Sequence, residues 1–374
     1  MIYLDYAATT PLDPDTLDQM LPYFTDIFAN PSSKHDCGVL AKEAVDRARA
    51  TLAALLGCRS EEIIFTSGAS ESNNLAVKGV AECLTEPKHF ITSEFEHKAC
   101  LYAMKRLEKW GHRVTYIKPN KYGIVEPESL LNAIEEDTIM VSIMHVNNEI
   151  GTIQPIDDFG DICREYGIIF HTDATQSFGK MVCRANANID MMSISAHKFY
   201  GPKGIGALFC RSELEITCQI DGGSQEKGLR SGTTNVPAIV GMAAAAQKNC
   251  ANMKENLEHY KTLEMAFISE IKKNVPMAYL QGDINFKVPW IQNICFYGID
   301  ASDLRDKLGE RNICVSKSSA CAHSNEASHV LQAIDTPEEL MPGAIRFSFG
   351  KHNTVEQVRM VAKEVACIVE GLRS

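Results

Sequence analysis

Short apolar runs alternate with longer amphipathic stretches between about residues 60 and 210. The apolar runs, rich in β-branched and aromatic residues, are predicted strands at residues 62–66, 89–93, 113–118, 139–146, 168–174, 191–196 and 206–210. The helical stretches between them are at residues 71–83, 97–110, 127–136 and 156–166. Such alternation predicts an α/β domain whose largely parallel sheet is covered by helices on both faces.

The pattern changes after this region. Residues 236–275 are predicted to form one long helix or two consecutive helices, because the alanines at 243–246 favour helix and Pro276 ends it. Shorter strands such as IQNICFYG and AIRFSFG follow, with helices between and after them. We therefore expect a large α/β domain at residues 14–256, and a small α+β domain in which residues 1–13 pack with residues 257–374.

Composition and charge narrow the class of protein. With 374 residues, 45% of them hydrophobic and 23% charged, the chain has the composition of a compact globular protein. The formal net charge of −11 disfavours nucleic-acid binding, which needs a basic surface. No apolar run approaches the roughly 18 residues of a membrane span, and MIYLDYAATTPLD does not resemble a signal peptide. We expect a cytoplasmic protein with no membrane partner.

Thirteen cysteines are scattered through the chain without CxxC pairs. This pattern predicts reduced, mostly buried thiols, with neither a disulfide framework nor a metal site. Cys321 is the exception, because the surrounding SKSSACAHSNEAS is polar and rich in small residues. We expect a mobile loop there, in which the thiol can ionise and reach a substrate. His323 could assist that ionisation, but a solvated loop histidine is the favoured explanation.

The segment SISAHKFYGPKGIGA places a lysine at the end of an apolar strand, before a turn rich in Gly and Pro. Lys198 would there be buried enough for its amine to be nucleophilic, so it could form a Schiff base with an aldehyde cofactor. A surface lysine is the alternative, but Ser195 and His197 at the same strand end could both bind a phosphate.

Two further segments fit a phosphate-bearing cofactor. In HTDATQS, Asp173 closes a strand expected to neighbour the lysine strand, where it could pair with a protonated pyridine nitrogen or simply cap a helix. Gln176 could bind the phenolic oxygen of the same ring. In TSGASESNN, a helix begins after Gly68, and its first backbone N–H groups with the Ser70 hydroxyl form an anion site.

Ten motifs occur in order across nearly the whole chain: YLDYAATTP, NPSSKH, TSGASESNN, EHKA, HVNNEIGTIQP, DATQS, SAHKFYGPKGIGAL, LRSGTTN, SSACAHS and IRFSFG. Together they closely resemble the cysteine desulfurases of the NifS/IscS type, in the class V aminotransferase group of pyridoxal-phosphate (PLP) enzymes. That resemblance implies PLP fold type I, with a mostly parallel seven-stranded sheet in the large domain and a smaller α+β domain.

The resemblance also implies roles for individual residues. Lys198 would carry PLP, Asp173 would pair with the ring nitrogen, Gln176 would contact the phenolic oxygen, and His97 would stack on the ring and move protons. The phosphate would be held by Ala69, Ser70, Ser195, His197 and, from the other subunit of a homodimer, Thr233. Asn148 would contact the cofactor and, with Arg346, bind the substrate carboxylate in a cleft that Asn30 also lines.

The implied reaction moves sulfur from L-cysteine onto Cys321 and releases alanine, and an acceptor protein then takes the sulfur for iron–sulfur cluster assembly or tRNA thiolation. The cysteine segment departs from the family's Cys-Thr-Ser pattern, Ser70 replaces a threonine, Lys351 replaces an arginine, and the stretch after Arg346 is short. The short stretch after Arg346 favours a dedicated acceptor over a general scaffold, and the cysteine segment alters the surface offered to a partner. The changes at Ser70 and Lys351 should not abolish activity. The alternatives are a selenocysteine lyase, another PLP β-lyase or aminotransferase, and a non-catalytic sulfur carrier.

Overall fold

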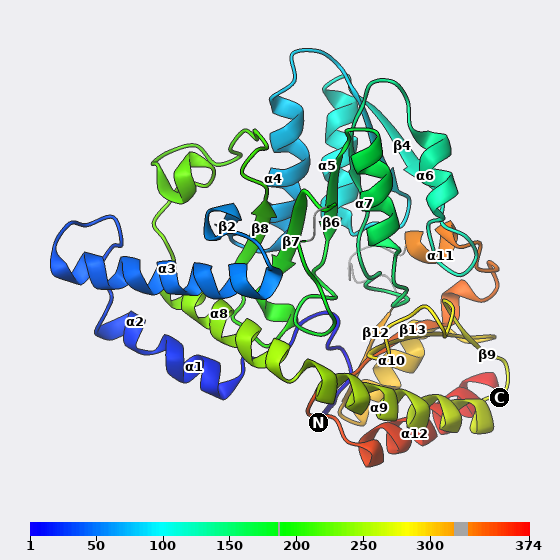
Figure 1. The fold of residues 1–374 in the computed structure, drawn as a ribbon. Helices are drawn as coiled ribbons and strands as arrows, with labels where there is room; N and C mark the ends of the chain where they lie inside the picture. Colours follow the sequence, from blue (N-terminus) through cyan, green and yellow to red (C-terminus); the bar gives the residue numbers. More distant parts are fainter. Residues whose placement is uncertain (186–187, 318–327) are drawn as a thin grey trace.

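A seven-stranded sheet forms the centre of the larger part of the molecule (Figure 1). The computed structural model describes residues 1–185, 188–317 and 328–374 of the chain. The strands of this sheet are β2 (Ile63–Thr66), β3 (His89–Ser93), β4 (Arg113–Ile117), β5 (Thr138–Ser142), β6 (Ile169–Asp173), β7 (Met191–Ser195) and β8 (Gly206–Cys210). The order across the sheet is β2-β8-β7-β6-β5-β3-β4, and only β8 runs antiparallel to its neighbours. The predicted fold class is confirmed, since each predicted strand coincides with one of these.

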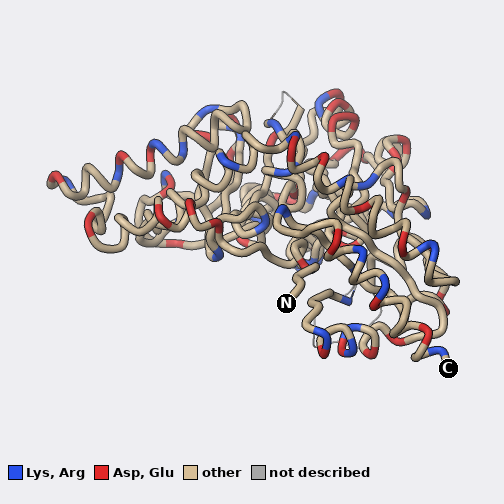
Figure 2. The backbone as a smooth tube through the Cα atoms, turned by 90° about the horizontal axis from the view of Figure 1, so that it is seen from below, with Lys and Arg blue, Asp and Glu red and all other residues tan. Residues whose placement is uncertain are grey.

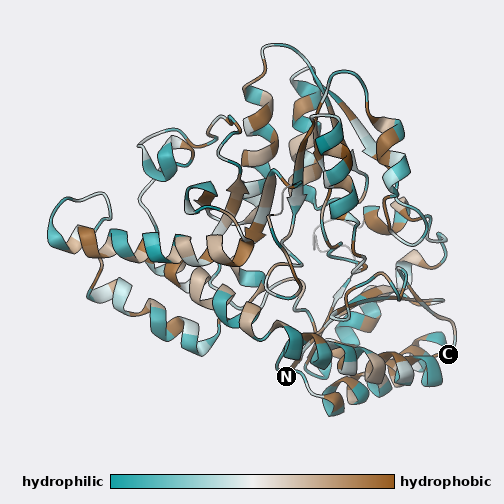
Figure 3. Ribbon diagram, in the orientation of Figure 1, coloured by the Kyte–Doolittle hydropathy of each residue, from teal (hydrophilic) through white to brown (hydrophobic). Residues whose placement is uncertain are grey.

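Helices cover both faces of this sheet, as the alternation of the strands requires (Figures 1 and 3). One face packs against α4 (Ala69–Glu82) and α5 (Lys98–Lys109), and it presents Ile64, Phe90, Met140 and Leu208. The other packs against α3 (Asp36–Leu56), α6 (Pro127–Ala133), α7 (Ile156–Glu165) and α8 (Val236–Ala251), and it presents Ile63, Ile91, Val141 and Phe209. The strands are therefore buried on both sides, which explains their nearly continuous apolar sequences.

A second, antiparallel sheet has its own core. It consists of β12 (Ser316–Lys317), β13 (Ala344–Ser348), β10 (Ile291–Phe296) and β9 (Ala278–Leu280) in that order. The helices α9 (Met253–Asn274), α10 (Ala301–Glu310) and α12 (Val355–Arg373) contribute to the same core, which also contains Leu4 and Ala7 from the start of the chain. In addition, β1 (Ile2–Tyr3) pairs in parallel with β11 (Ile313–Cys314). Leu4 and Ala7 thus lie in the core of the small sheet, while the division into domains at residues 14–256 and at residues 1–13 with 257–374 stays a prediction.

Three short helices complete the described chain: α1 (Pro14–Met20), α2 (Pro22–Thr25) and α11 (His329–Ala333). The region predicted as one or two helices at residues 236–275 is two, α8 and α9, separated at Asn252. None of the helices in the described part of the chain is long and apolar enough to span a bilayer. Acidic and basic residues alternate along the helices and loops in Figure 2.

The cysteines are more exposed than the sequence pattern predicts. The twelve within the described residues are all free, as expected, but only five are buried, so the expectation of mostly buried thiols is wrong. Cys37, Cys83 and Cys367 are exposed because each lies on the outer side of a helix or at its end.

A buried carboxylate ties three distant segments together. Asp13, just before α1, is 3% exposed and accepts hydrogen bonds from the ammonium groups of Lys248 on α8 at 2.7 Å and Lys351 after β13 at 2.6 Å. Burial alone would raise the pKa of Asp13, but the two lysines outweigh it and lower that pKa to about 2. This cluster links the N-terminal segment, the large sheet's helices and the small sheet.

We expect Asp13→Asn to lower the free energy of unfolding at pH 7 by about 2 kcal/mol, because a folded-state pKa below the unfolded value of 3.8 stabilises the folded protein above that pH. The difference from wild type should narrow as the pH falls from 3.8 towards 2. Urea unfolding at several pH values measures it. Asp46→Asn, which removes an exposed i,i+4 pair with Lys42, is the matched control and should change the free energy of unfolding by less than about 0.5 kcal/mol. Equal losses in both variants would contradict the assignment.

Candidate active site

A cavity of about 570 Å³ lies at the carboxyl ends of β6 and β7, beside the first turns of α4 and α5. This is the edge at which open α/β sheets bind ligands. The cavity brings together the following residues singled out from the sequence: Ala69, Ser70, His97, Asn148, Asp173, Gln176, Ser195, His197, Lys198 and Arg346. These come from positions spread over most of the chain. The strand ends of the large sheet bring them together with Arg346, which lies on β13 of the small sheet.

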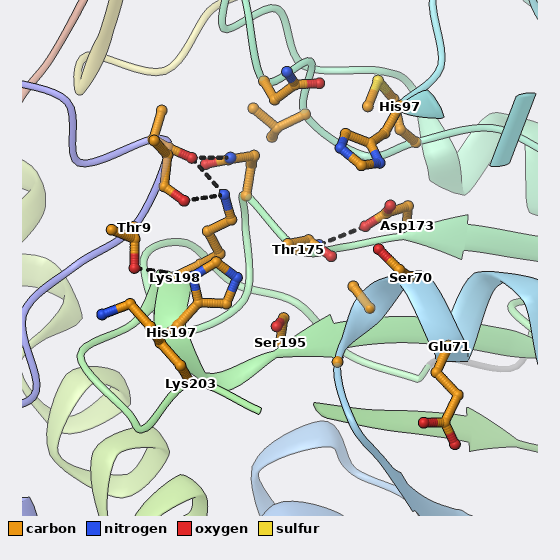
Figure 4. Close-up of a pocket in the computed structure, with 18 of the residues that line it drawn as sticks. Thr9, Ser70, Glu71, His97, Asp173, Thr175, Ser195, His197, Lys198 and Lys203 are labelled. Carbon is orange, nitrogen blue, oxygen red and sulfur yellow. Dashed lines mark hydrogen bonds between the residues drawn. The ribbon is translucent and has the colours of Figure 1, made fainter. Parts of the chain in front are cut away.

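Lys198 follows β7 directly, at the end of a short 3-10 turn (Ala196–Lys198). Its amine donates hydrogen bonds to the backbone carbonyls of Ala7 at 2.6 Å and Ala8 at 2.8 Å (Figure 4). Burial, reinforced by the charge of Arg346, lowers the pKa of Lys198 to about 8. Roughly a tenth of this amine is therefore unprotonated at pH 7, far more than of a lysine at the ordinary value of 10.5, and the unprotonated amine is the form that attacks an aldehyde.

Asp173 ends β6, which pairs in parallel with β7, so the predicted neighbourhood of the carboxylate and the lysine is correct. The carboxylate accepts from the Thr175 backbone N–H at 2.9 Å and from the side-chain amide of Asn73 at 2.7 Å. Asn73 is fully buried on α4, and its own carbonyl oxygen has no partner among the described residues. It therefore fixes the orientation of Asp173.

Sequence reasoning missed Asn73, although a signal was present. Asn73, Val77 and Val80 are spaced as one face of a helix, and all three are buried against the sheet. A polar residue in such an apolar stripe needs a buried polar partner. The carbonyls of Ala7 and Ala8 gave no comparable signal, because a backbone acceptor is the same in every residue.

The other end of the cavity can accommodate an anion. Helix α4 begins after Gly68 without any side-chain cap, so its first N–H groups are available beside Ser70 and Ser195. A Cβ on Gly68, whose φ is +153°, would be strained and would lie 3.6 Å from the Ser195 hydroxyl. His197 shares a 3.1 Å hydrogen bond with Thr9, and burial together with Lys198 lowers its pKa to about 4. A neutral His197 can still donate to a phosphate.

His97 lies across the cavity from Lys198 in Figure 4. Its Nδ1 accepts from the Ala99 backbone N–H at 3.1 Å, which caps α5, and burial lowers the pKa of the imidazole. The ring is therefore neutral near pH 7, with its proton on Nε2.

Arg346 lies on β13 and is 1% exposed. It donates to the Asn148 backbone carbonyl at 2.9 Å and to Asp5 at 2.8 Å, while its Nε has no partner among the described residues. This guanidinium retains donors for a carboxylate, and its pairing with Asp5 reduces the cost of burying the charge.

Several predicted residues lie elsewhere. Asn30 is exposed, accepts from the Ser32 N–H, and does not line the cavity. Thr233 is also exposed and lines a neighbouring hollow of about 210 Å³ that shares Gly204 with the cavity. Cys321 and His323 lie outside the described residues.

The cavity fits pyridoxal phosphate. It offers a buried amine of lowered pKa, a fixed carboxylate on the neighbouring strand, an uncapped helix start for the phosphate, and the buried Gln176 carbonyl, which has no partner among the described residues. Its volume falls within the range of about 300–1,000 Å³ usual for cofactor sites. Fold and cavity together define a PLP enzyme of fold type I.

Comparison with known proteins gives the family. Residues 2–361 match the model of the class V aminotransferases. "Cysteine desulfurase IscS" of Rickettsia rickettsii is 45% identical over an alignment that covers 100% of this chain and 92% of that protein. The chain therefore belongs to the class V aminotransferase family, and within it to the PLP-dependent cysteine desulfurases.

Solved structures agree. A "NifS-like protein" superposes with a TM-score of 0.94 at 36% identity, covering 99% of this chain and 100% of that one. The structure described as "SspA in complex with cysteine" has a TM-score of 0.85 at 39% identity, covering 95% and 100% of the two chains.

We expect Asn73→Ala to raise the Kd of the cofactor-free protein for pyridoxal phosphate by roughly tenfold, because Asp173 loses a charge-assisted hydrogen bond. Equilibrium dialysis measures this Kd. The control is Asn74→Ala, because Asn74 is only partly buried and its side chain donates to the backbone carbonyl of Ser70 in its own helix. An unchanged Kd in Asn73→Ala would show that Asn73 does not hold the carboxylate.

Proposed function

We propose that Lys198, Asp173, His97 and Arg346 perform the L-cysteine desulfuration of this family, with Cys321 as the sulfur-accepting thiol. The observation that carries the proposal is the meeting of a buried amine, held by two backbone carbonyls, with an oriented carboxylate at the ends of adjacent parallel strands. No other part of the described chain has this combination.

The cofactor, when bound, withdraws electrons from the substrate's α-carbon. Lys198 would hold the cofactor, and its amine, with a pKa of about 8, would be the base that moves the proton on the substrate's Cα. His97 is a second group that could give or take a proton, at its Nε2 atom. Arg346 binds the substrate carboxylate beside Asn148. This contact orients the bonds at the substrate's Cα toward Lys198 and His97.

Sulfur transfer is then redox-neutral. The Cys321 thiolate attacks the substrate sulfur, an S–S bond forms, and the Cβ–S bond breaks with its electron pair left on the substrate carbon. Protonation of that carbon gives alanine, and the chain keeps a persulfide. An acceptor protein would take the sulfur for cluster assembly or tRNA thiolation.

We expect Cys321→Ala to keep the visible absorbance of bound cofactor but to lose L-alanine production from L-cysteine in the presence of a thiol reductant. Cys83→Ala, which removes an exposed thiol at the end of α4, should retain wild-type production. Chromatographic assay of alanine measures both. Undiminished alanine production in Cys321→Ala would show that the substrate sulfur leaves without passing to Cys321 and would contradict the proposed role of this thiol.

The functional unit is a homodimer in this proposal. Thr233 is exposed and lies outside the cavity of its own chain, while the segment before it is tied to the cavity rim by the 3.0 Å ion pair between Arg230 and Glu71. The helices α1, α2 and the start of α3 lie side by side (Figure 1) and expose large apolar side chains: Leu17, Leu21, Phe24, Phe28, Val39 and Leu40. A second copy of the chain would bury such a surface.

Mixed dimers test whether Thr233 serves the partner's site. A dimer of one Lys198→Ala chain and one Thr233→Val chain, purified with two different tags, should have about half the wild-type activity, because one of its two sites keeps both residues. Each variant alone should be impaired. A mixed dimer no more active than its parents would place Thr233 in its own chain's site or in none.

A further inference from the structure

The start of α11 is hydrogen-bonded to two of the segments that carry cavity residues, the one containing Asn148 and the one containing His97. Ser328, the first described residue after 318–327, donates its hydroxyl proton to the Glu149 carboxylate at 2.5 Å. The next residue, His329, has its Nε2 2.9 Å from the backbone carbonyl of Glu96. Glu149 directly follows Asn148, and Glu96 directly precedes His97.

Both acceptors are held rigidly. The backbone N–H of Glu149 donates to the Asn147 side chain at 2.8 Å. The Glu96 carboxylate accepts from Ser93 at 2.5 Å and from the Met144 N–H at 2.9 Å. The residues at the root of α11 are therefore fixed against the same backbone that places Asn148 and His97.

Building α11 does not require Glu149. The Ser328 oxygen already caps the helix by accepting from the Leu331 N–H at 3.2 Å. A carboxylate that is 4% exposed is costly to bury, and burial raises the pKa of Glu149 to about 7 although Ser328, Arg346 and Lys98 oppose the shift. A carboxylate buried at such a free-energy cost, beside the cavity, points to a role in the site.

We propose that Ser328 and Glu149 are positioning residues for sulfur transfer: their hydrogen bond fixes the start of α11, a few residues after Cys321 in the sequence, against the loop that carries Asn148. This inference rests on the proposed function, because Cys321 precedes Ser328 by only a few residues in the sequence. Losing the Ser328–Glu149 bond slows the transfer of sulfur to Cys321 and leaves every step without Cys321 unchanged.

The test compares two reactions of the PLP-loaded enzyme. Persulfide formation on Cys321, followed by mass spectrometry in a single turnover with L-cysteine, requires the segment. Elimination of chloride from β-chloro-L-alanine does not. In Ser328→Ala, persulfide formation should fall roughly tenfold while β-chloro-L-alanine turnover and the spectroscopic Kd for L-cysteine stay within about twofold of wild type.

Three further variants test whether the effect comes from the hydrogen bond between Ser328 and Glu149. Ser328→Thr keeps the hydroxyl and should restore the wild-type rate, whereas Glu149→Leu removes the acceptor and should match Ser328→Ala. Thr354→Ala removes the equivalent hydroxyl cap of α12, away from the site, and should leave persulfide formation unchanged.

Two results would overturn the inference alone: an unchanged persulfide rate in Ser328→Ala and Glu149→Leu, or an equal fall in both reactions, which marks a purely structural role. A wild-type chain that forms no persulfide on Cys321 would overturn the proposed function as well.

Discussion

The parallel pairing of β6 with β7 is the constraint on which the site depends. Its register sets Asp173 opposite Ser193, so the carboxylate and the strand leading into Lys198 end at the same edge of the sheet. Burial on both faces removes that edge from water. The low pKa of Lys198 and the need for Asn73 beside Asp173 are both consequences of this burial.

The site is assembled from parts that are distant in sequence. The N-terminal segment supplies the carbonyls of Ala7 and Ala8 to Lys198, and the same segment pairs Asp5 with Arg346 of the small sheet. Asp13 then binds Lys248 and Lys351, which come from the two different cores. The residues that contact Lys198 and Arg346 are therefore close in sequence to Asp13, which joins the two cores. A substitution that loosens the contact between the cores should also weaken cofactor binding.

The strands, both helical layers, and the placing of Lys198 beside Asp173 were predictable, because hydrophobic period and strand-end chemistry are local signals. The carbonyls that hold Lys198 were not, since backbone groups leave no sequence pattern. Asn73 was readable as a polar residue on an apolar helix face, but its partner is set by tertiary packing. Thr233 does not line the cavity of its own chain, and its predicted contact with the cofactor of a second copy stays a proposal. The exposure of Cys37, Cys83 and Cys367 depends on helix orientation, which composition does not determine.

The central claim is that burial lowers the pKa of Lys198 to about 8, so that far more of its amine is unprotonated near neutral pH than in an ordinary lysine. The rate at which cofactor-free protein takes up pyridoxal phosphate, followed by its visible absorbance against pH, tests this directly, with Lys198→Ala as the blank. Only the neutral amine attacks the aldehyde, so the account predicts that the rate rises with pH and levels off with a midpoint near 8. A rate that keeps rising to the ordinary lysine value of 10.5 would contradict it.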